Sequence, residues 1–474
     1  MNGVASFTPT AVLWTSADAV EATGGRATRP FETTGVAIDN RAVRPGDLFV
    51  ALVGPNHDGH DFVAKALTAG AAAAVVHRIP DGVGADSPLL VVGDSFAALG
   101  HLARQARNRC PGRIVAVTGS VGKTGVKEAL RYVLGGQGPT AASEGNLNNH
   151  WGLPLSLARL APDSAFGVFE VGMNHAGEIT PLSQLLRPLV AVITTVEAVH
   201  AGHFPSVEAI ADAKAEIFAG LDRNGAAVLP RDNPHFERLA AAARAAGCAR
   251  LVGFGRHAEA QARVLDATLG PDHSDVEAEI FGRRLEYRLS IPGPHWVVNS
   301  VAVLAAVAAI GADVLDAAER LPRLEAMAGR GRRQTIDLGS GSFALIDESY
   351  NASPVSIEAA LAVLGRATVG KGGRRIAVLG DMLELGVDSG RLHEGLAAAI
   401  EANRIDLVFA SGPEMARLAT RLPKSRLGAH AATSAALAPL VAAAVHAGDV
   451  VTVKGSAGSK MGAVVQALVA RARG

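Results

Sequence analysis

Short apolar runs alternate with glycine-rich turns and helix-like segments along most of the chain. The runs are short enough to be strands buried on both faces, and each leads into a segment of helical pattern. The clearest of them are Ile114–Val117, Phe166–Val171, Leu189–Thr195, Arg375–Leu379, Asp406–Phe409 and Val450–Val453. This alternation predicts parallel sheets covered by helices, and therefore an α/β fold.

The chain of 474 residues is too long for one ordinary hydrophobic core. One break in the pattern falls near Pro111-Gly112, just before the strand at Ile114, and a second falls near Gly329-Arg-Gly-Arg332. We therefore expect three domains, at residues 1–111, 112–328 and 329–474. The second would carry a nucleotide site.

The composition favours a soluble protein in a reducing compartment. The most apolar stretch, Val301–Ile310, is shorter than the ~20 residues of a membrane span, so we expect a core helix there. Residues 1–20 contain no lysine or arginine, unlike the start of a signal peptide. Two cysteines, Cys110 and Cys248, cannot form a disulfide framework. These features predict a cytoplasmic location.

The charge balance excludes partners that depend on a bulk field. Lysine plus arginine and aspartate plus glutamate number 45 each, so the formal net charge is zero. Neither nucleic acid nor an anionic membrane surface would be attracted to the chain as a whole. We therefore expect partners to be recognised at local sites. A monomer is a separate expectation.

A glycine-rich loop follows the strand at Ile114–Val117. Its sequence is Thr118-Gly-Ser-Val-Gly-Lys-Thr124, and a helical pattern begins at about Lys123. The glycines allow successive backbone N–H groups to surround phosphate oxygens, the lysine adds a positive charge, and the threonine hydroxyl can ligate Mg²⁺. The residues predicted to bind the nucleotide here are Thr118, Gly119, Ser120, Val121, Gly122, Lys123 and Thr124.

The loop departs from the full Walker pattern, which has glycine where this chain has Val117. The alternative interpretation is a glycine turn with a surface lysine and no ligand. A strand before the loop and a helix after it favour the phosphate-binding interpretation.

Two side chains at strand ends are candidates for a divalent cation. Glu170 lies at the end of the run Phe166–Val171, and His200 follows the next strand. Ligands of α/β proteins bind at the carboxyl ends of strands, and a nucleoside triphosphate requires a divalent ion. Each residue alone could equally be an ordinary polar loop residue.

Lys214 lies on the apolar stripe of a predicted helix. On the segment 205–221, the residues on one face at helical spacing are Ile210, Lys214, Ile217, Phe218 and Leu221. An unpaired ammonium in that position is costly. Either the side chain extends outward to solvent, or it has a buried partner or a chemical modification.

Taken together, these motifs resemble those of the Mur ligases, the bacterial enzymes that build the peptide of the cell-wall precursor. The resemblance continues through five further segments. They are Pro292-Gly-Pro-His-Trp-Val-Val-Asn299, Gly329-Arg-Gly-Arg332, Asp347-Glu-Ser-Tyr-Asn-Ala-Ser-Pro354, Val378-Leu-Gly-Asp-Met-Leu-Glu-Leu-Gly386 and Lys454-Gly-Ser456. Near the N-terminus, Ile38–Leu52 and Asp58–Phe62 resemble the family's UDP-sugar-binding domain. The motifs run in order from about residue 36 to residue 460.

The resemblance implies a three-domain fold, with a UDP-substrate domain, a central ATPase domain and a Rossmann-like domain for the incoming amine. The forms of the C-terminal motifs are most similar to those of members that add D-alanyl-D-alanine to UDP-N-acetylmuramoyl-tripeptide. The implied reaction uses ATP and Mg²⁺, proceeds through an acyl phosphate, and belongs to cytoplasmic peptidoglycan precursor synthesis.

The resemblance also implies roles for individual residues. Lys214 would be carbamylated by CO₂, which turns a costly cation into an anionic metal ligand. The implied catalytic residues are Lys123, His200 and Lys214, and the implied Mg²⁺ ligands are Thr124, Glu170, His200 and Lys214. Further nucleotide contacts would come from Asn299, Asp347 and either Arg330 or Arg332. The implied substrate-binding residues are Asp39, Arg41, Asn146, Asn148, Asn149, Tyr350 and Asn351.

Three alternatives remain at this point. The chain could be a Mur ligase that adds a single amino acid, or a folylpolyglutamate synthase, although the UDP-type N-terminal block argues against the latter. It could also be a non-catalytic nucleotide-binding homologue. That alternative predicts loss of some phosphate or metal residues, yet Lys123, Thr124, Glu170, His200 and Lys214 are all present.

Overall fold

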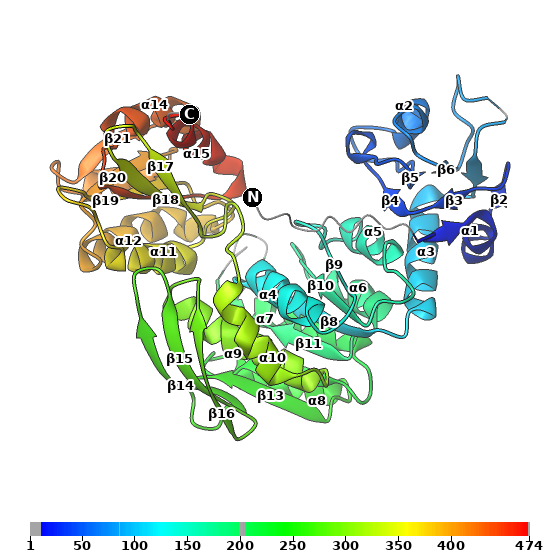
Figure 1. The fold of residues 1–474 in the computed structure, drawn as a ribbon, viewed down its shortest axis with the longest axis horizontal. Helices are drawn as coiled ribbons and strands as arrows, with labels where there is room; N and C mark the ends of the chain where they lie inside the picture. The colour runs from blue at the N-terminus through cyan, green and yellow to red at the C-terminus, as the bar shows by residue number, and fades with distance from the viewer. Residues whose placement is uncertain (1–10, 85, 199–201, 203, 473–474) are drawn as a thin grey trace.

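The structure is a computed structural model, and it describes residues 11–84, 86–198, 202 and 204–472. Three lobes follow one another along the chain, each built on its own large sheet (Figure 1). We call them the N-terminal part (β1 to α3, residues 14–109), the central part (β8 to η4, residues 113–323) and the C-terminal part (β17 to α15, residues 332–469). The predicted α/β class is confirmed.

The N-terminal part contains a five-stranded sheet that is parallel except at one edge. Its strands, in spatial order, are β2 (Arg26–Ala27), β7 (Leu89–Val91), β6 (Ala73–Val76), β5 (Asp47–Val50) and β4 (Gly35–Ala37). A small antiparallel pair is formed by β1 (Trp14–Thr15) and β3 (Glu32–Thr33). The helices are α1 (Ser16–Thr23), α2 (Val63–Thr68) and α3 (Ser95–Arg109), with short 3₁₀ turns η1 (Asn40–Ala42) and η2 (Gly59–Phe62).

The central part contains a nine-stranded sheet. Its parallel strands, in spatial order, are β9 (Thr140–Ala142), β10 (Phe166–Glu170), β8 (Arg113–Thr118), β11 (Val190–Ile193), β12 (Ala226–Pro230), β13 (Arg250–Gly255) and β14 (Ala262–Leu269). Two antiparallel strands, β15 (Ser274–Ile280) and β16 (Arg283–Leu289), complete it. The helices are α4 (Lys123–Gly135), α5 (Gly152–Ala158), α6 (Ile179–Leu186), α7 (Val207–Ala215), α8 (Phe236–Ala245), α9 (Pro294–Ala309) and α10 (Val314–Arg320), with 3₁₀ turns η3 (Glu216–Gly220) and η4 (Leu321–Arg323).

The C-terminal part contains a six-stranded sheet with one antiparallel edge strand. Its spatial order is β17 (Arg332–Asp337), β18 (Ser342–Glu348), β22 (Val450–Lys454), β19 (Arg375–Gly380), β20 (Leu407–Ser411) and β21 (Leu427–Ala431). The helices are α11 (Pro354–Arg366), α12 (Ser389–Ala402), α13 (Met415–Arg421), α14 (Ser434–Ala444) and α15 (Gly462–Val469), with 3₁₀ turns η5 (Gly386–Asp388) and η6 (Ala457–Ser459).

The buried cores connect the first two parts but not the third. One continuous apolar cluster runs from Trp14 and Leu99 in the N-terminal part to Leu153 and Ile193 in the central part. Among the described residues, the clusters on the two faces of the C-terminal sheet contain only residues of that part. The N-terminal and central parts are therefore packed as one body, and the C-terminal part has a core of its own.

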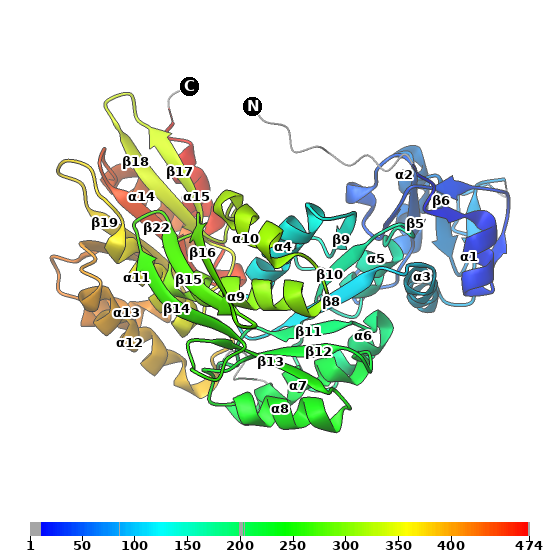
Figure 2. The ribbon, with the colours of Figure 1, turned by 60° about the horizontal axis from the view of Figure 1, so that its bottom comes forward.

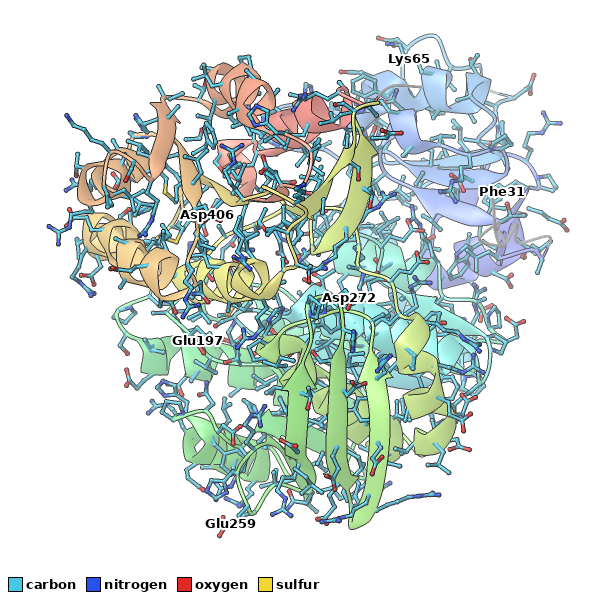
Figure 3. The ribbon with its side chains drawn as sticks, turned by 60° about the vertical axis from the view of Figure 1, so that its left-hand side comes forward. Phe31, Lys65, Glu197, Glu259, Asp272 and Asp406 are labelled. Atoms are coloured by element: carbon cyan, nitrogen blue, oxygen red, sulfur yellow. The ribbon has the colours of Figure 1, made fainter. Side chains whose placement is uncertain are left out.

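The C-terminal part nevertheless lies against the central part. The hairpin strands β14 to β16 reach toward α11 in two views (Figures 1 and 2). Asp272, in the turn between β14 and β15, lies at this junction (Figure 3). Burial lowers the pKa of Arg333, and the Asp272 carboxylate acts against this shift. The backbone N–H of Gly202 also donates to the backbone carbonyl of Glu384 (3.3 Å) across this boundary.

One sequence prediction requires correction, and another is confirmed. The helix predicted at residues 205–221 begins at Val207, and its α-helical part ends at Ala215, after which η3 continues as a 3₁₀ helix. The stretch Val301–Ile310 does form a core helix, but α9 begins seven residues earlier, at Pro294.

Among the described residues, no helix combines the length and apolar character of a bilayer span. Cys110 and Cys248 are both buried and free.

Candidate active site

The glycine-rich loop joins the buried strand β8 to helix α4, as predicted. Gly119 and Gly122 adopt positive φ angles of 144° and 88°, which L side chains rarely adopt. The ammonium of Lys123 curls over the loop and donates hydrogen bonds to the carbonyl oxygens of Gly119 (2.7 Å) and Ser120 (3.3 Å). Burial lowers the pKa of Lys123, and the nearby Arg330 lowers it further, whereas Glu170 acts in the opposite direction.

The end of the neighbouring strand β11 fixes the shape of the loop. The hydroxyl of Thr194 donates to the carbonyl of Val121 (2.6 Å). The backbone N–H of Ser120 donates to the carbonyl of Thr195 (2.8 Å), and its hydroxyl accepts from the N–H of Glu197 (2.9 Å). These contacts order the loop before any ligand binds, which lowers the entropic cost of binding.

Gly119→Ala is expected to lower the free energy of unfolding by about 2–3 kcal/mol and to weaken nucleotide binding. A Cβ at this position would lie 1.9 Å from Thr194 Oγ1, at a φ angle of 144°. The matched control is Gly135→Ala on α4, where a Cβ would meet nothing within 4 Å. Urea unfolding of both variants is the measurement. Equal unfolding midpoints for Gly119→Ala and the wild type would contradict this account of the loop.

Glu170, at the end of β10, is fixed beside the loop. It is 2% exposed, and its Oε2 accepts a hydrogen bond of 2.6 Å from the hydroxyl of Thr124. Its Oε1 accepts one of 2.8 Å from the side-chain amide of Asn148. A buried carboxylate and a loop threonine in contact are oxygen donors of the kind that Mg²⁺ prefers.

Lys214, on α7, is 2% exposed. The interpretation that its side chain extends outward to solvent is therefore wrong. Within the described residues, its amine has neither a hydrogen-bond partner nor an ion-pair partner. Burial holds the pKa of Lys214 well below its usual value, and the nearby ammonium of Lys123 lowers it further. A neutral buried amine is the form that reacts with an electrophile.

The donor set fits a divalent cation in part. Thr124, Glu170 and Lys214 are buried near the same loop, and a carbamate on Lys214 would add oxygen donors. His200 lies outside the described residues, so its predicted role is not addressed by the geometry. Within the described residues, no group of three histidine, cysteine, aspartate or glutamate side chains is placed to hold a metal. Threonine and carbamate ligands are not of these types.

Two side chains of α9, an amide and an aromatic ring, lie next to the phosphate loop and the first turn of α4. A Cβ added to Gly122 would lie 3.2 Å from the side chain of Asn299. A Cβ added to Gly125 would lie 3.1 Å from the ring of Trp296. The structure thus places the predicted nucleotide contact Asn299 next to the phosphate loop. Trp296 was not predicted, and it closes the space beside the first turn of α4.

The loop that leads into the C-terminal part contributes an arginine, and β18 contributes an acid. Arg330 stacks on the ring of Tyr350, with Cζ 4.0 Å from the ring centroid, and it is near enough to lower the pKa of Lys123. Asp347 accepts hydrogen bonds from the N–H of Gly329 (2.8 Å) and the hydroxyl of Ser349 (2.6 Å). Asp347 therefore shapes the loop that carries Arg330.

The predicted substrate residues fall into separate groups. Asp39 and Arg41 form an exposed ion pair of 2.6 Å on the N-terminal part, and the hydrogen bonds from Arg41 lower the pKa of Asp39. Asn146, Asn148 and Asn149 lie in the loop before α5.

Two of these asparagine side chains make hydrogen bonds within the protein. Asn149 accepts from the N–H of Gly152 (2.9 Å) at the start of α5, and Asn148 holds Glu170. Asn351 follows Tyr350 at the C-terminal sheet, and its backbone carbonyl accepts a hydrogen bond from the ammonium of Lys454 (3.1 Å).

A phosphate loop between a buried strand and a helix, a carboxylate at the next strand end and an arginine from another lobe define a P-loop nucleotide-binding protein. Family models match three successive segments, the Mur ligase family catalytic domain at residues 32–107, the Mur ligase middle domain at 117–307 and the Mur ligase glutamate ligase domain at 331–457. The chain belongs to the Mur ligase family.

Individual relatives are similar over nearly the whole chain. The UDP-N-acetylmuramoyl-tripeptide–D-alanyl-D-alanine ligase of Escherichia coli (strain K12) is 36% identical over 436 residues, which cover 91% of this chain and 93% of the relative. An Acinetobacter baumannii ligase structure of that type superimposes with a TM-score of 0.84, at 29% identity and with 98% of this chain covered and 100% of the other. A MurF ligase from Thermotoga maritima in complex with ADP gives a TM-score of 0.76, at 28% identity and with 93% and 98% covered.

Proposed function

We propose that this chain is an ATP-dependent ligase that adds D-alanyl-D-alanine to UDP-N-acetylmuramoyl-tripeptide. The observation that carries the proposal is the joint burial, beside Lys123, of the Thr124–Glu170 pair and of Lys214, which has no partner within the described residues. Such a site suits a nucleotide and a metal rather than a structural role, because an unpaired buried amine costs stability. The similarity to a UDP-N-acetylmuramoyl-tripeptide–D-alanyl-D-alanine ligase over nine-tenths of the chain supports the choice of substrates.

The reaction would begin with activation of a carboxylate. The terminal carboxylate of the tripeptide attacks the γ-phosphorus of ATP in line, which forms an acyl phosphate and releases ADP. Lys123 would leave the carbonyls of Gly119 and Ser120 and bind phosphate oxygens instead. Catalysis of this step is mainly positioning and charge neutralisation. The amine of D-alanyl-D-alanine then attacks the acyl carbon and displaces phosphate.

Mg²⁺ would be held by Thr124, Glu170, His200 and a carbamate on Lys214. When bound, the ion neutralises charge on the phosphate oxygens. Carbamylation fits the electrostatics of the described residues, because Lys214 and Lys123 repel each other as two cations. A carbamate changes that repulsion into an attraction.

Arg330 is the better candidate than Arg332 for the arginine that reaches the phosphates. The charge of Arg330 acts on Lys123 in the phosphate loop. Arg332 begins β17, where its backbone pairs with that of Asp347, and its side chain is exposed. We further propose Asn299 and Asp347 as nucleotide contacts, and Asp39, Arg41, Asn146, Asn148, Asn149, Tyr350 and Asn351 as substrate-binding residues.

We also propose functional boundaries and a setting. A UDP-substrate domain would occupy residues 1–111, an ATPase domain residues 112–328 and a dipeptide-binding ligase domain residues 329–474. The protein would act as a monomer in the cytoplasm, in peptidoglycan precursor synthesis.

Phosphate release in the presence of ATP and UDP-N-acetylmuramoyl-tripeptide tests the proposed function. We expect turnover with D-alanyl-D-alanine and at least about a hundredfold less with L-alanine, D-glutamate or a free diamino acid. A pocket that must pair both ends of a dipeptide discriminates strongly against shorter amines. Turnover with a single amino acid alone would overturn the substrate assignment and keep the ligase class.

A further inference from the structure

Glu348 lies at the point where the strand order of the C-terminal sheet reverses. The chain crosses from β18 to β19, continues outward to β20 and β21, and returns as β22 between β18 and β19. Ligands of open α/β sheets bind at such a point, beyond the carboxyl ends of the strands. Glu348 ends β18 and Lys454 ends β22, the strand paired with it.

Lys454 fixes one oxygen of the Glu348 carboxylate. Lys454 is 4% exposed. Its ammonium donates hydrogen bonds to Glu348 Oε2 (3.1 Å) and to the backbone carbonyl of Asn351 (3.1 Å). The side chain of Glu348 keeps 22% of its surface exposed. The carboxylate is thus oriented by a buried cation and remains accessible from one side.

The second oxygen of Glu348 is free to bind a ligand. Within the described residues, Oε1 has no hydrogen-bond partner. It lies 3.3 Å from the position of a Cβ on Gly331, beside the loop that carries Arg330 toward the phosphate loop. His295 of the central part is near Glu348 and Lys454. Burial lowers the pKa of His295. The Glu348 carboxylate raises this pKa, whereas the Lys454 ammonium lowers it.

We propose that Glu348 is the catalytic carboxylate that binds the incoming amine and carries its proton during amide formation, with Lys454 as the positioning residue. This inference rests on the proposed function, which requires an amine to meet an acyl phosphate at the junction of the central and C-terminal parts. An ammonium is attracted to the free oxygen of Glu348, and it loses one proton to solvent to become the nucleophile.

Glu348 carries one proton from the attacking nitrogen to the leaving phosphate. The amine lone pair forms the N–C bond, and the nitrogen of the tetrahedral intermediate becomes cationic and acidic. Glu348 accepts one proton from it. The C–O bond to the phosphoryl group then breaks, phosphate leaves with the bonding electron pair, and Glu348 returns the proton to it. The carboxylate is regenerated, and the products are the amide and hydrogen phosphate.

Glu348→Gln separates this role from ATP use. Glutamine still accepts a hydrogen bond from Lys454, so the fold should be retained, but it cannot take a proton. We expect amide formation to fall by about a hundredfold or more, as for loss of a general base. Acyl phosphate formation, trapped with hydroxylamine as the hydroxamate, should stay within about threefold of the wild-type rate, because hydroxylamine is an uncharged nucleophile at neutral pH.

The matched control is Glu358→Gln on α11, an exposed glutamate ten residues further along the same part. It should form both hydroxamate and amide at wild-type rates. Amide formation by Glu348→Gln within about threefold of wild type would overturn the proposal. An equal fall in hydroxamate and amide would also overturn it, because it would indicate a structural role. Wild-type turnover of D-alanyl-D-alanine tests the proposed function separately, and the comparison can be repeated with whichever amine the wild type accepts.

Discussion

Lys123→Ala is expected to reduce ADP formation by on the order of a thousandfold or more, the effect of removing a preorganised charge from a transition state. In the structure, the Lys123 ammonium bonds to two carbonyl oxygens of its own loop and so lies where nucleotide phosphates would bind. Alanine removes that positive charge and leaves the loop glycines unchanged. Phosphate transfer would then lack the cation nearest to the developing charge.

The measurement is ADP release with saturating UDP-N-acetylmuramoyl-tripeptide, combined with calorimetric binding of that substrate. Its affinity should change little, because the proposed UDP-binding residues lie in the N-terminal part. Lys424→Ala is the control, since Lys424 is an exposed lysine of the C-terminal part. Normal turnover by Lys123→Ala would disprove the assignment of the phosphate loop.

Lys214→Ala is expected to be inactive, and small carboxylates such as formate or acetate should restore part of the activity. The substitution removes the buried amine that would carry the carbamate and leaves a cavity where a carboxylate can bind next to Lys123. Lys214→Met is the matched variant, because its side chain fills the same space. It should be inactive and unresponsive to carboxylates.

The rescue is measured as phosphate release against carboxylate concentration for both variants. Because Lys214 has no partner among the described residues, neither substitution breaks a bond seen in the fold. Unfolding midpoints close to wild type would therefore accompany the loss of activity for Lys214→Met. Wild-type activity of either variant without added carboxylate would mean that Lys214 has only a packing role.

The local parts of the site could be predicted from sequence. Lys123 and Thr124 follow a strand and begin a helix, and Glu170 ends a neighbouring strand, so their meeting follows from the rule that parallel strands share a carboxyl edge. The apolar stripe around Lys214 indicated that the residue was unusual. Periodicity alone could not decide between burial and exposure, because a long side chain can satisfy either.

Contacts between distant segments could not be predicted in this way. Asn148 holds Glu170 across 22 residues of sequence, and Thr194 fixes Val121 across 73. Neither Asn148 nor Thr194 is distinguished by its immediate neighbours, since small polar residues are common in loops. Glu348 is similar: its free oxygen becomes apparent only when Lys454, from a strand 106 residues away, is seen to occupy the other one.

The division of the buried cores has a consequence for the energetics of domain movement. The apolar cluster that joins Trp14 to Ile193 would have to be exposed if the N-terminal part turned against the central part, whereas no buried apolar cluster of the described residues joins the C-terminal part to the central part. Water can replace polar contacts at little net cost, but exposed apolar surface remains unfavourable. Substrate binding therefore has to supply only a modest free energy to select the relative orientation in which the amine and the acyl phosphate meet.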